Sequence, residues 1–379
     1  MDNKLIERDK LKILFITDIP SPYRVDFFNE LNQYCNLTVI FERKYSGTRE
    51  ITWIKNKGFK FKGVFLNNSQ KRKFSIKQIK KILNTEKFDL IIIGCYSTII
   101  GIRTIMYLKR KKINFVISAD GGMIKNDERK IMYNLKKYLI GSAKYWLSTG
   151  KNTNEYLKYY GAKESGIYLY PFSSIKDSYI QNKLNKSEIK ALKKENNIKE
   201  EKIILSVGRF IFRKGFDVLI NVMKNLDKNI GLYIVGGNPT EEYMKIVEEN
   251  KLNNVHFIEF KNQEELENYY RVADVFAFPT RGDIWGLVIN EAMAKGLPII
   301  TTNKCVAGLE LIEDGKNGFI VPVDNIEELK NAIEKIISDE KLQETMSKSN
   351  IEKIKKYTIE NMAKVHVEIF EKILNEERK

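Results

Sequence analysis

Two acids lie close together in residues 281–300, "RGDIWGLVINEAMAKGLPII". Asp283 precedes a Trp-Gly pair, and Glu291 lies within the apolar run that follows. A carboxylate among Val, Ile, Ala and Met is costly to bury unless another group pairs with it. The stretch reads as a loop that opens a helix near Gly286. The backbone N–H groups of residues 285–288 would then be free to bind an anion, phosphate above all.

The spacing of the two acids suggests what they hold. Glu291 lies four residues after Leu287, one helical turn further in. There its carboxylate can accept hydrogen bonds from two neighbouring hydroxyls, such as those of a ribose. Asp283, at the loop tip, can do the same for a sugar ring. Two acids for two polyols, with a helix terminus for the phosphates between them, indicate a nucleotide sugar. The alternative is that Glu291 is a helix-surface residue and Asp283 a near-cap.

A second stretch, "SVGRFIFRKGFDVLI", supplies cations. It reads as a strand, Gly208-Arg209, a short loop, and then Lys214-Gly215 opening a helix. An Arg and a Lys aimed at one site would neutralise a diphosphate. Because the charge grows as a leaving group departs, the pair would also act in the transition state. The alternative is two solvated cations in a Lys-rich chain, and Arg213 could replace Lys214.

Elements that would position these residues recur along the chain. Continuous Ile, Val and Leu runs separated by helical patterns predict parallel sheets covered on both faces. A Lys-rich stretch at 176–202 reads as a linker plus a surface helix, and the tail is helical. The runs expected to be strands are 12–18, 36–42, 89–95, 114–120 and 145–150, then 203–209, 232–237, 255–260, 275–280, 298–303 and 318–323.

We therefore expect two doubly wound α/β domains in tandem, each with its site at the carboxyl ends of its strands. The first would span 1–180, with the C-terminal helix 357–379 packing back on it. The second would span 181–356. A cleft between them is the natural place for two substrates to meet.

Four segments carry a family resemblance: "GRFIFRKGFDVLI", "YRVADVFAFPT", "RGDIWGLVINEAMAKGLPII" and "LIEDGKNGFIVPV". In this order and spacing, the chain resembles the retaining GT-B glycosyltransferases of family 4 from about 202 to 324. The N-terminal half matches loosely, through "ILFITDIPSPYRVDFF". The resemblance implies a GT-B fold, with two Rossmann-like domains facing across a cleft.

The resemblance also implies roles in donor binding. Arg209 and Lys214 would bind the diphosphate, and Glu291 would hold the ribose. Asp283 falls where the family has a Glu that contacts the transferred sugar, and the shorter side chain would seat the sugar differently. Phe260 falls near the base. The candidate donor-binding residues are Gly208, Ile284, Trp285, Gly286, Leu287, Val288 and Phe260.

Two loops in the N-terminal half are candidates for the acceptor side. In "DIPSPYRVDFF", Ser21 is expected to cap a helix, and Tyr23 and Arg24 open it. The resemblance implies that this loop borders the transferred sugar and the acceptor, although many members carry Gly-Gly there. Asp120-Gly121 ends another strand. Asp120 could stabilise an oxocarbenium-like transition state or accept a sugar hydroxyl, whereas a plain tight turn is the alternative.

The formal charge of +16 favours an anionic partner. Nucleic acid, acidic lipid and phosphorylated substrates all fit, and so does Lys placed on solvated faces. The stretches 69–83, 108–114 and 128–141 interleave Lys and Arg with apolar residues, as a surface that docks on anionic lipid does. A nucleic-acid face would look similar, but no nucleic-acid fold signature accompanies it. We expect a cytoplasmic protein, peripheral on the inner face of the membrane.

The composition argues against other sites. The three Cys are far apart and form no C-x-x-C motif, so neither a zinc site nor a disulfide framework is expected. This pattern suits a reducing compartment. His256 and His366 read as structural residues. No apolar stretch of signal-peptide length precedes the first strand, and the longest apolar run, 90–102, is too short to span a bilayer.

The sequence thus predicts a retaining glycosyltransferase that moves a hexose from a nucleotide diphosphate sugar to a glycan or lipid-linked glycan acceptor. No metal or cofactor is expected, since Arg209, Lys214 and the helix terminus supply positive charge. Two alternatives stay open. One is another GT-B enzyme, such as a glycoside phosphorylase or a sugar-nucleotide epimerase. The other is a basic nucleic-acid- or membrane-binding protein with a vestigial pocket.

Overall fold

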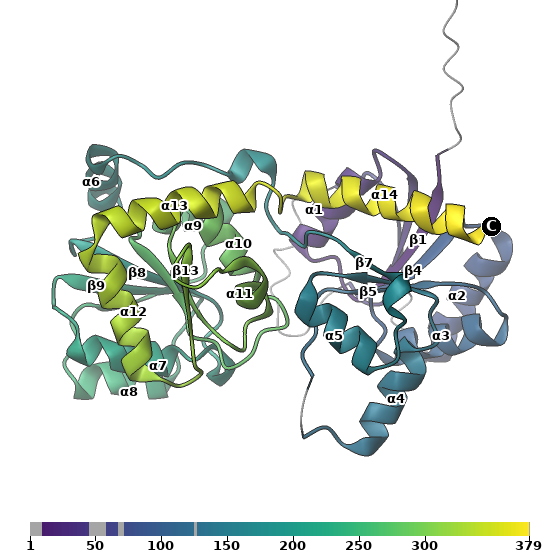
Figure 1. Cartoon of the computed structure of the whole chain (residues 1–379), viewed down its shortest axis with the longest axis horizontal. Coiled ribbons are helices and arrows are strands. Elements are labelled where there is room, and N and C mark those ends of the chain that lie inside the picture. Colours follow the sequence, from purple (N-terminus) through teal and green to yellow (C-terminus); the bar gives the residue numbers. More distant parts are fainter. Residues whose placement is uncertain (1–9, 45–57, 67–71, 125–126, 379) are drawn as a thin grey trace, which may run out of the picture. The chain divides into compact units, whose positions relative to one another are not determined.

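The structure is a computed structural model that describes residues 10–44, 58–66, 72–124 and 127–378 (Figure 1). The chain forms two compact units. Unit 1 comprises Met1–Ser174 and Ile359–Lys379, and unit 2 comprises Ile175–Thr358. The chain therefore leaves unit 1, builds all of unit 2, and returns to unit 1 for its last helix.

The described part of unit 1 contains a seven-stranded parallel sheet with the order β3-β2-β1-β4-β5-β6-β7. Its interior strand β1 is buried throughout Ile13–Ile16, as expected for an apolar run covered on both faces. The strands are β1 (Lys12–Thr17), β2 (Asn36–Phe41), β3 (Lys62–Phe65), β4 (Leu90–Ile93), β5 (Val116–Ala119), β6 (Tyr145–Ser148) and β7 (Ile167–Leu169).

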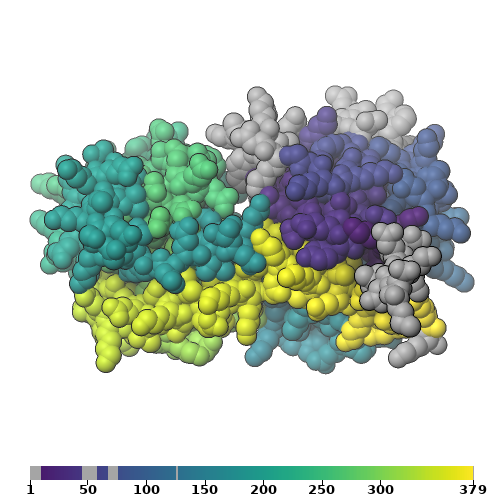
Figure 2. Space-filling view, turned by 90° about the horizontal axis from the view of Figure 1, so that it is seen from above, coloured from purple at the N-terminus to yellow at the C-terminus, as the bar shows by residue number. Residues whose placement is uncertain are grey.

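Helices cover both faces of this sheet (Figure 1). On one face α14 packs against α1, and Figure 2 shows the yellow segment of α14 against the purple of α1. On the other face α3 packs between α2 and α4. The helices of unit 1 are α1 (Pro22–Leu31), α2 (Arg72–Thr85), α3 (Ile99–Arg110), α4 (Lys130–Ile140), α5 (Lys151–Tyr159) and α14 (Ile359–Glu377).

Unit 2 is built around a six-stranded parallel sheet with the order β10-β9-β8-β11-β12-β13. The first strand, β8, pairs with β9 on one side and with β11 on the other. The strands are β8 (Lys202–Val207), β9 (Ile230–Val235), β10 (Val255–Ile258), β11 (Val275–Phe278), β12 (Ile299–Thr302) and β13 (Gly318–Val321).

Figure 1 shows α7, α8 and α12 on one face of this sheet and α9, α10 and α13 on the other. The Lys-rich stretch before β8 forms α6, which begins with a capping box between Asn185 and Glu188 and packs against α9. The helices of unit 2 are α6 (Lys186–Glu195), α7 (Phe216–Val222), α8 (Glu241–Glu249), α9 (Gln263–Val272), α10 (Leu287–Ala294), α11 (Val306–Leu311), α12 (Ile326–Ser338) and α13 (Glu340–Ile354).

The long apolar runs became strands as expected, whereas β3 and β7 were not predicted. Both are edge strands of three or four residues, and β3 keeps much of its surface in solvent. A short edge strand needs no continuous apolar run, because one side of it is not covered by the sheet. Hydrophobic patterning alone could therefore not detect them.

Candidate functional site

The candidate site of unit 2 lies where β8 and β11 end. The strand order reverses between these neighbours, because β9 and β10 continue to one side of β8 while β11, β12 and β13 continue to the other. In open α/β sheets, ligands bind at the carboxyl ends of the strands beside such a switch point. The loop after β8 carries Gly208, Arg209 and Lys214, and the loop after β11 carries Asp283.

Glycines let the two loops meet. Gly215 has a left-handed backbone with a φ of 68°, and a Cβ added there would lie 2.1 Å from the carbonyl oxygen of Pro279. A Cβ on Gly236, after β9, would lie 1.7 Å from the carbonyl oxygen of Gly208. Only glycine permits such approaches of one backbone to another. The loops after β8, β9 and β11 are therefore packed directly against each other.

An ion pair joins the two loops. Lys214 Nζ lies 2.6 Å from Asp283 Oδ2, and each side chain is 13 % exposed. Arg213 Nη1 lies 3.0 Å from the same carboxylate oxygen and also donates to the carbonyl oxygen of Gly282. Lys214 Nζ also lies 4.5 Å from the centre of the Phe278 ring. Burial lowers the pKa of Lys214 below its ordinary value and Arg213 adds to this, while Asp283 opposes the change.

Arg281, in the loop after β11, holds this loop against the loop after β8. Its two guanidinium nitrogens donate to Asp217 at 2.9 and 2.6 Å, and its Nε donates to Asp324 at 2.8 Å. Its Nη1 donates to the carbonyl oxygen of Phe212 at 2.7 Å, and its backbone N–H donates to that of Arg213 at 2.8 Å. Sequence reasoning missed Arg281, because nothing in the stretch "TRGD" distinguishes a structural Arg from a ligand-binding one.

Helix α10 begins directly after the Asp283 loop. Gly286 precedes it with a φ of 106°, and a Cβ there would lie 2.9 Å from Cys305 Sγ. The Trp285 side chain is buried, and its indole N–H donates to Asn290 at 2.9 Å. Trp285 can therefore offer a ligand its backbone but not its ring. Ile284 is 63 % exposed, while Leu287 and Val288 are half-buried.

Glu291 lies one turn into α10 on the same face as Leu287 and is half-buried. The hydroxyl of Tyr270, a buried residue of α9, donates to Glu291 Oε2 at 3.0 Å. Burial raises the pKa of Tyr270 well above its ordinary value, and the Glu291 carboxylate adds to this. Tyr270 therefore stays protonated and fixes the carboxylate. Sequence reasoning did not detect this contact, because a Tyr in an amphipathic helix usually indicates a core position.

Other expected donor residues lie at the ends of strands in the same sheet. Arg209 is exposed directly after Gly208, and no ion pair of Arg209 occurs within the described residues. Phe260 follows β10 and is 51 % exposed. The structure thus brings Lys214 and Asp283 into contact, and it puts Arg209 and Phe260 at the same edge of the sheet.

The acceptor-side candidates of unit 1 form a separate cluster. Arg24 of α1 makes an ion pair with Asp120, which follows β5, and the Arg24 side chain is only 6 % exposed. Tyr170 donates its hydroxyl to the other oxygen of Asp120 at 3.0 Å. The Arg24 guanidinium lies 5.8–6.0 Å from four aromatic ring centres, including those of Phe15 and Phe172. Burial alone would lower the pKa of Arg24, but the neighbouring Asp120 raises it above its ordinary value.

The remaining unit 1 candidates flank this pair. Ser21 occupies the position before α1 and Pro22 its first turn, but the Ser21 side chain makes no capping hydrogen bond. The prediction that Ser21 caps α1 is therefore wrong. Ser21 occupies the N-cap position, but its buried side chain donates or accepts no capping hydrogen bond. Tyr23 packs edge-on against Phe172. Gly121 is buried with a φ of 144°, which suits glycine.

Both histidines have structural surroundings. His366 of α14 is buried, its Nδ1 lies 2.7 Å from the carbonyl oxygen of Met362, and burial lowers its pKa to about 3. His256 of β10 lies 2.6 Å from Glu200 and stacks on Tyr233.

Within the described residues, no group of three or more His, Cys, Asp or Glu is arranged to hold a metal ion. Cys35, Cys95 and Cys305 are buried free thiols. No helix in the described part of the chain has the length and apolar character needed to cross a bilayer.

Comparison with known proteins agrees with this geometry. A family model described as "Glycosyl transferases group 1" matches residues 188–353. An uncharacterized glycosyltransferase of Methanocaldococcus jannaschii is 32% identical over 157 residues, which cover 41% of this chain and 44% of that protein. The capsular polysaccharide biosynthesis glycosyltransferase CapM of Staphylococcus aureus is 32% identical over 167 residues, 40% of this chain and 43% of CapM. The chain thus spans about half the length, or less, of the curated relatives it matches.

The fold extends the similarity to nearly the whole chain. The crystal structure of Anabaena HepE in complex with UDP matches with a TM-score of 0.78 and 16% sequence identity, covering 96% of this chain and 100% of that one. At 16% identity this match supports the fold alone. The expected fold class, GT-B with two Rossmann-like parallel sheets, is confirmed.

Proposed function

Because residues 188–353 belong to the glycosyl transferases group 1 family, we propose that the protein is a retaining glycosyltransferase. It would move a hexose from a nucleotide diphosphate sugar to a hydroxyl of a glycan or lipid-linked glycan in cell-surface polysaccharide synthesis. The observation that carries the proposal is the contact between Lys214 and Asp283 beside the start of α10, with Glu291 one turn further in.

Lys214 suits the diphosphate of the donor. An ammonium group has three N–H donors, and Asp283 accepts one of them. Two donors are then left for phosphate oxygens, and Arg209 can approach from the exposed side. The unpaired backbone N–H groups at the start of α10 add further donors. As the sugar–phosphate bond breaks, negative charge gathers on the leaving diphosphate, so these groups bind the transition state more tightly than the ground state.

Asp283 would then act in two ways. It keeps Lys214 charged and oriented in a partly buried site, and its second oxygen can accept a hydroxyl of the transferred sugar. Glu291 would accept the two ribose hydroxyls, held in place by Tyr270. Gly208, Ile284, Leu287 and Val288 would line the donor site, with the backbone of Trp285 and Gly286 and the ring of Phe260.

For the displacement itself we favour front-face attack, with the leaving phosphate accepting the acceptor proton. Asp120 is a weak candidate for a nucleophile, because Arg24 and Tyr170 already engage both of its oxygens. It would instead act with Tyr23, Arg24, Ser21 and Gly121 in holding the sugar or the acceptor. No metal is required in this scheme, since protein groups neutralise the diphosphate.

The relatives suggest which substrates to try first. HepE was crystallised with UDP, and CapM is a capsular polysaccharide glycosyltransferase. A UDP-sugar and a surface-glycan acceptor are therefore the leading pair. Helix α4 supports an acceptor in a membrane: Ile131 is 80 % exposed, Met132 and Tyr138 are about half exposed, and Lys130 and Lys137 lie on the same helix. Such a surface fits the headgroups of an anionic bilayer.

The first experiment measures nucleotide release from UDP-, GDP-, ADP- and TDP-sugars, without and with a membrane lipid extract. We expect release from one donor, stimulated by the extract, and loss of release in Glu291→Ala. The matched control is Glu248→Ala, which removes an exposed carboxylate from α8. Unchanged release in Glu291→Ala would contradict the proposal.

Other outcomes identify the alternatives. Release that requires inorganic phosphate would indicate a phosphorylase, and conversion of the donor without any acceptor would indicate an epimerase. The absence of both release and nucleotide binding, together with salt-dependent RNA or DNA binding, would indicate a nucleic-acid-binding protein.

A further inference from the structure

A second hollow opens at the other end of the strands that carry the candidate donor site. β8 begins at Lys202 and ends before Gly208, and β11 begins after Asp274 and ends before Pro279. Lys202 and Asp274 line a pocket of about 1330 Å³ within unit 2. A six-residue strand spans roughly 20 Å, so this pocket and the Lys214–Asp283 pair are well separated.

Two stretches far apart in the sequence form the pocket together with Asp274: residues 182–202, which include α6, and residues 340–355, which include α13. Figure 2 shows the teal segment around α6 beside the yellow-green segment of α13 on one face of unit 2. The expected "linker plus surface helix" is therefore one wall of a pocket.

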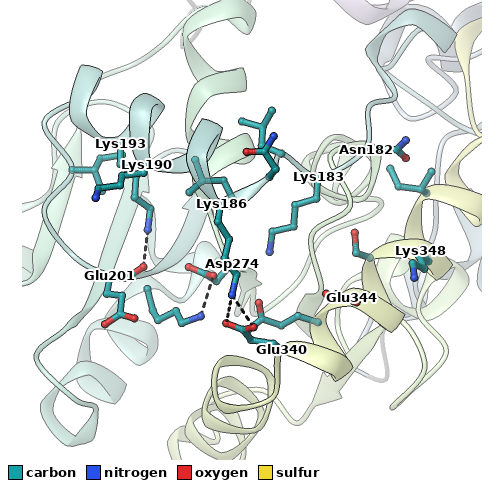
Figure 3. A pocket seen from close by; sticks show the side chains of 18 of the residues that line it. Asn182, Lys183, Lys186, Lys190, Lys193, Glu201, Asp274, Glu340, Glu344 and Lys348 are labelled. Atoms are coloured by element: carbon teal, nitrogen blue, oxygen red, sulfur yellow. Dashed lines mark hydrogen bonds and ion pairs between the residues drawn. The ribbon is translucent and has the colours of Figure 1, made fainter.

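The pocket gathers ammonium groups around one carboxylate. Lys202 Nζ lies 3.8 Å from Asp274 Oδ1, while the other oxygen of Asp274 accepts the backbone N–H of Ile203 at 2.8 Å. Lys193 Nζ donates to the carbonyl oxygen of Glu201 at 2.6 Å. Lys183 projects into the pocket between α6 and α13 (Figure 3). Asp274 thus lies in the lysine-rich part of the pocket, where lysines outnumber acids in the lining.

Burial and neighbouring lysines disfavour the charged forms of Lys183 and Lys193. Burial lowers the pKa of Lys183 below its ordinary value, and Lys202 adds to this, whereas Asp274, Glu340 and Glu344 oppose it. Burial also lowers the pKa of Lys193, with further contributions from Lys202 and Lys183. A charged group that is desolvated and crowded by like charges gains when an opposite charge arrives.

The rest of the lining fits an organic anion. Nine lining residues are lysines and six are acids, so the pocket has an excess of positive charge. Among the acids, Glu340 is already paired with Lys186 at 3.1 Å. Four aliphatic side chains line the same hollow: Leu184, Ile189, Ile198 and Ile351. Cations at one place and aliphatic walls at another suit a ligand with an anionic head and an apolar body.

We propose that this pocket binds a soluble organic phosphate monoester, its phosphate among Lys183, Lys193 and Lys202 and its apolar part against the aliphatic wall. Lys193 uses two N–H donors on the carbonyl oxygens of Glu200, at 3.4 Å, and Glu201, at 2.6 Å, and so keeps one for the ligand. A phosphate carries close to two negative charges near neutral pH, which the excess of lysines over acids in the lining can balance.

The test is calorimetric titration of the full chain with 1-naphthyl phosphate, with inorganic phosphate and 1-naphthol as its two halves. We expect 1-naphthyl phosphate to bind more tightly than either half. Lys183→Glu should weaken it by about tenfold or more, the size of a lost charge-assisted hydrogen bond, and Lys183→Arg should largely retain it. Lys245→Glu, the same charge reversal on the exposed surface of α8, should leave the affinity unchanged.

Two further arms separate this site from the others. Lys214→Met and added UDP should leave 1-naphthyl phosphate binding intact, so the pocket can succeed or fail independently of the proposed donor site. Vesicles containing phosphatidic acid should not displace the probe. Equal affinity in Lys183→Glu and Lys245→Glu, displacement by UDP, or displacement by the vesicles would each overturn the proposal.

Discussion

Each unit places an ion pair at the carboxyl edge of its sheet, and the two pairs are built alike. In unit 2 the cation, Lys214, follows β8, and its acid, Asp283, follows β11. In unit 1 the cation, Arg24, follows β1, and its acid, Asp120, follows β5. In both units the cation comes from the segment after the first strand, and the acid comes from a later loop.

The surroundings of the two pairs differ. Lys214 and Asp283 lie among charged groups, with Arg213 on the same carboxylate. Arg24 is enclosed by aromatic rings, and its acid is also held by Tyr170. A cation among charges can change partners when a phosphate arrives, because other groups satisfy the acid it leaves. The Arg24 guanidinium, enclosed by aromatic rings, cannot change partners in this way. We therefore expect the Lys214–Asp283 pair to rearrange when a ligand binds, and the Arg24–Asp120 pair to stay intact where it borders the proposed acceptor site.

The largest expected effect is on unit 1. Arg24→Met removes the partner of a largely buried carboxylate, so the free energy of unfolding should fall by about 3 kcal/mol. Urea unfolding monitored by fluorescence measures this. Arg24→Met/Asp120→Asn should recover part of the loss. If Arg24→Met were no more destabilising than Lys214→Met, the contrast between the two pairs would be wrong.

Next is the catalytic effect in unit 2. Lys214→Met should lower sugar transfer about a hundredfold, since one donor to the developing charge is lost. Its urea midpoint should change little, because Arg213 still pairs with Asp283. Transfer rates at saturating donor test this, with Lys245→Met on the surface of α8 as the control. Wild-type rates in Lys214→Met would place the diphosphate elsewhere.

A third prediction concerns acid stability in unit 1. The pKa of His366 is about 3 in the folded state, below the ordinary value of about 6.5 expected when unfolded. Between these two pH values the His366 imidazole is protonated in the unfolded chain but neutral in the folded chain. Stability should therefore fall as pH drops below 6.5, with a slope that approaches about 1.4 kcal/mol per pH unit from this group alone once the unfolded imidazole is protonated. His366→Leu should show a shallower slope in unfolding experiments at pH 5.5 and 6.5, and an unchanged slope would exclude His366 as the cause.

The smallest effect distinguishes two helix starts. Asn262 accepts the backbone N–H of Glu265 at 3.0 Å ahead of α9, whereas Ser21 makes no such bond ahead of α1. Asn262→Ala should therefore cost about 1 kcal/mol, and Ser21→Ala no more than a few tenths. Thermal unfolding of the two variants measures the difference. Equal losses would mean that the Ser21 hydroxyl contributes through another contact.

The parallel sheets and the two charged loops of unit 2 could be predicted from the sequence, because apolar runs and charged residues next to glycines are local patterns. Contacts between side chains distant in sequence could not be predicted in this way. Tyr270 and Glu291 meet only because α9 and α10 lie side by side, and Arg281 binds an acid 64 positions away. Asp120 was expected to face a sugar, and its pairing with Arg24 depends on strand order, which composition does not encode.

The return of α14 to unit 1 has a consequence for synthesis. The ribosome must produce all of unit 2 before the helix that packs on α1 appears. At about 5–20 residues per second, this delay lasts roughly ten to forty seconds. During it, the apolar side of α1, including Phe27, which later contacts His366, lacks its covering. Unit 1 thus completes its packing only after all of unit 2 has been synthesised.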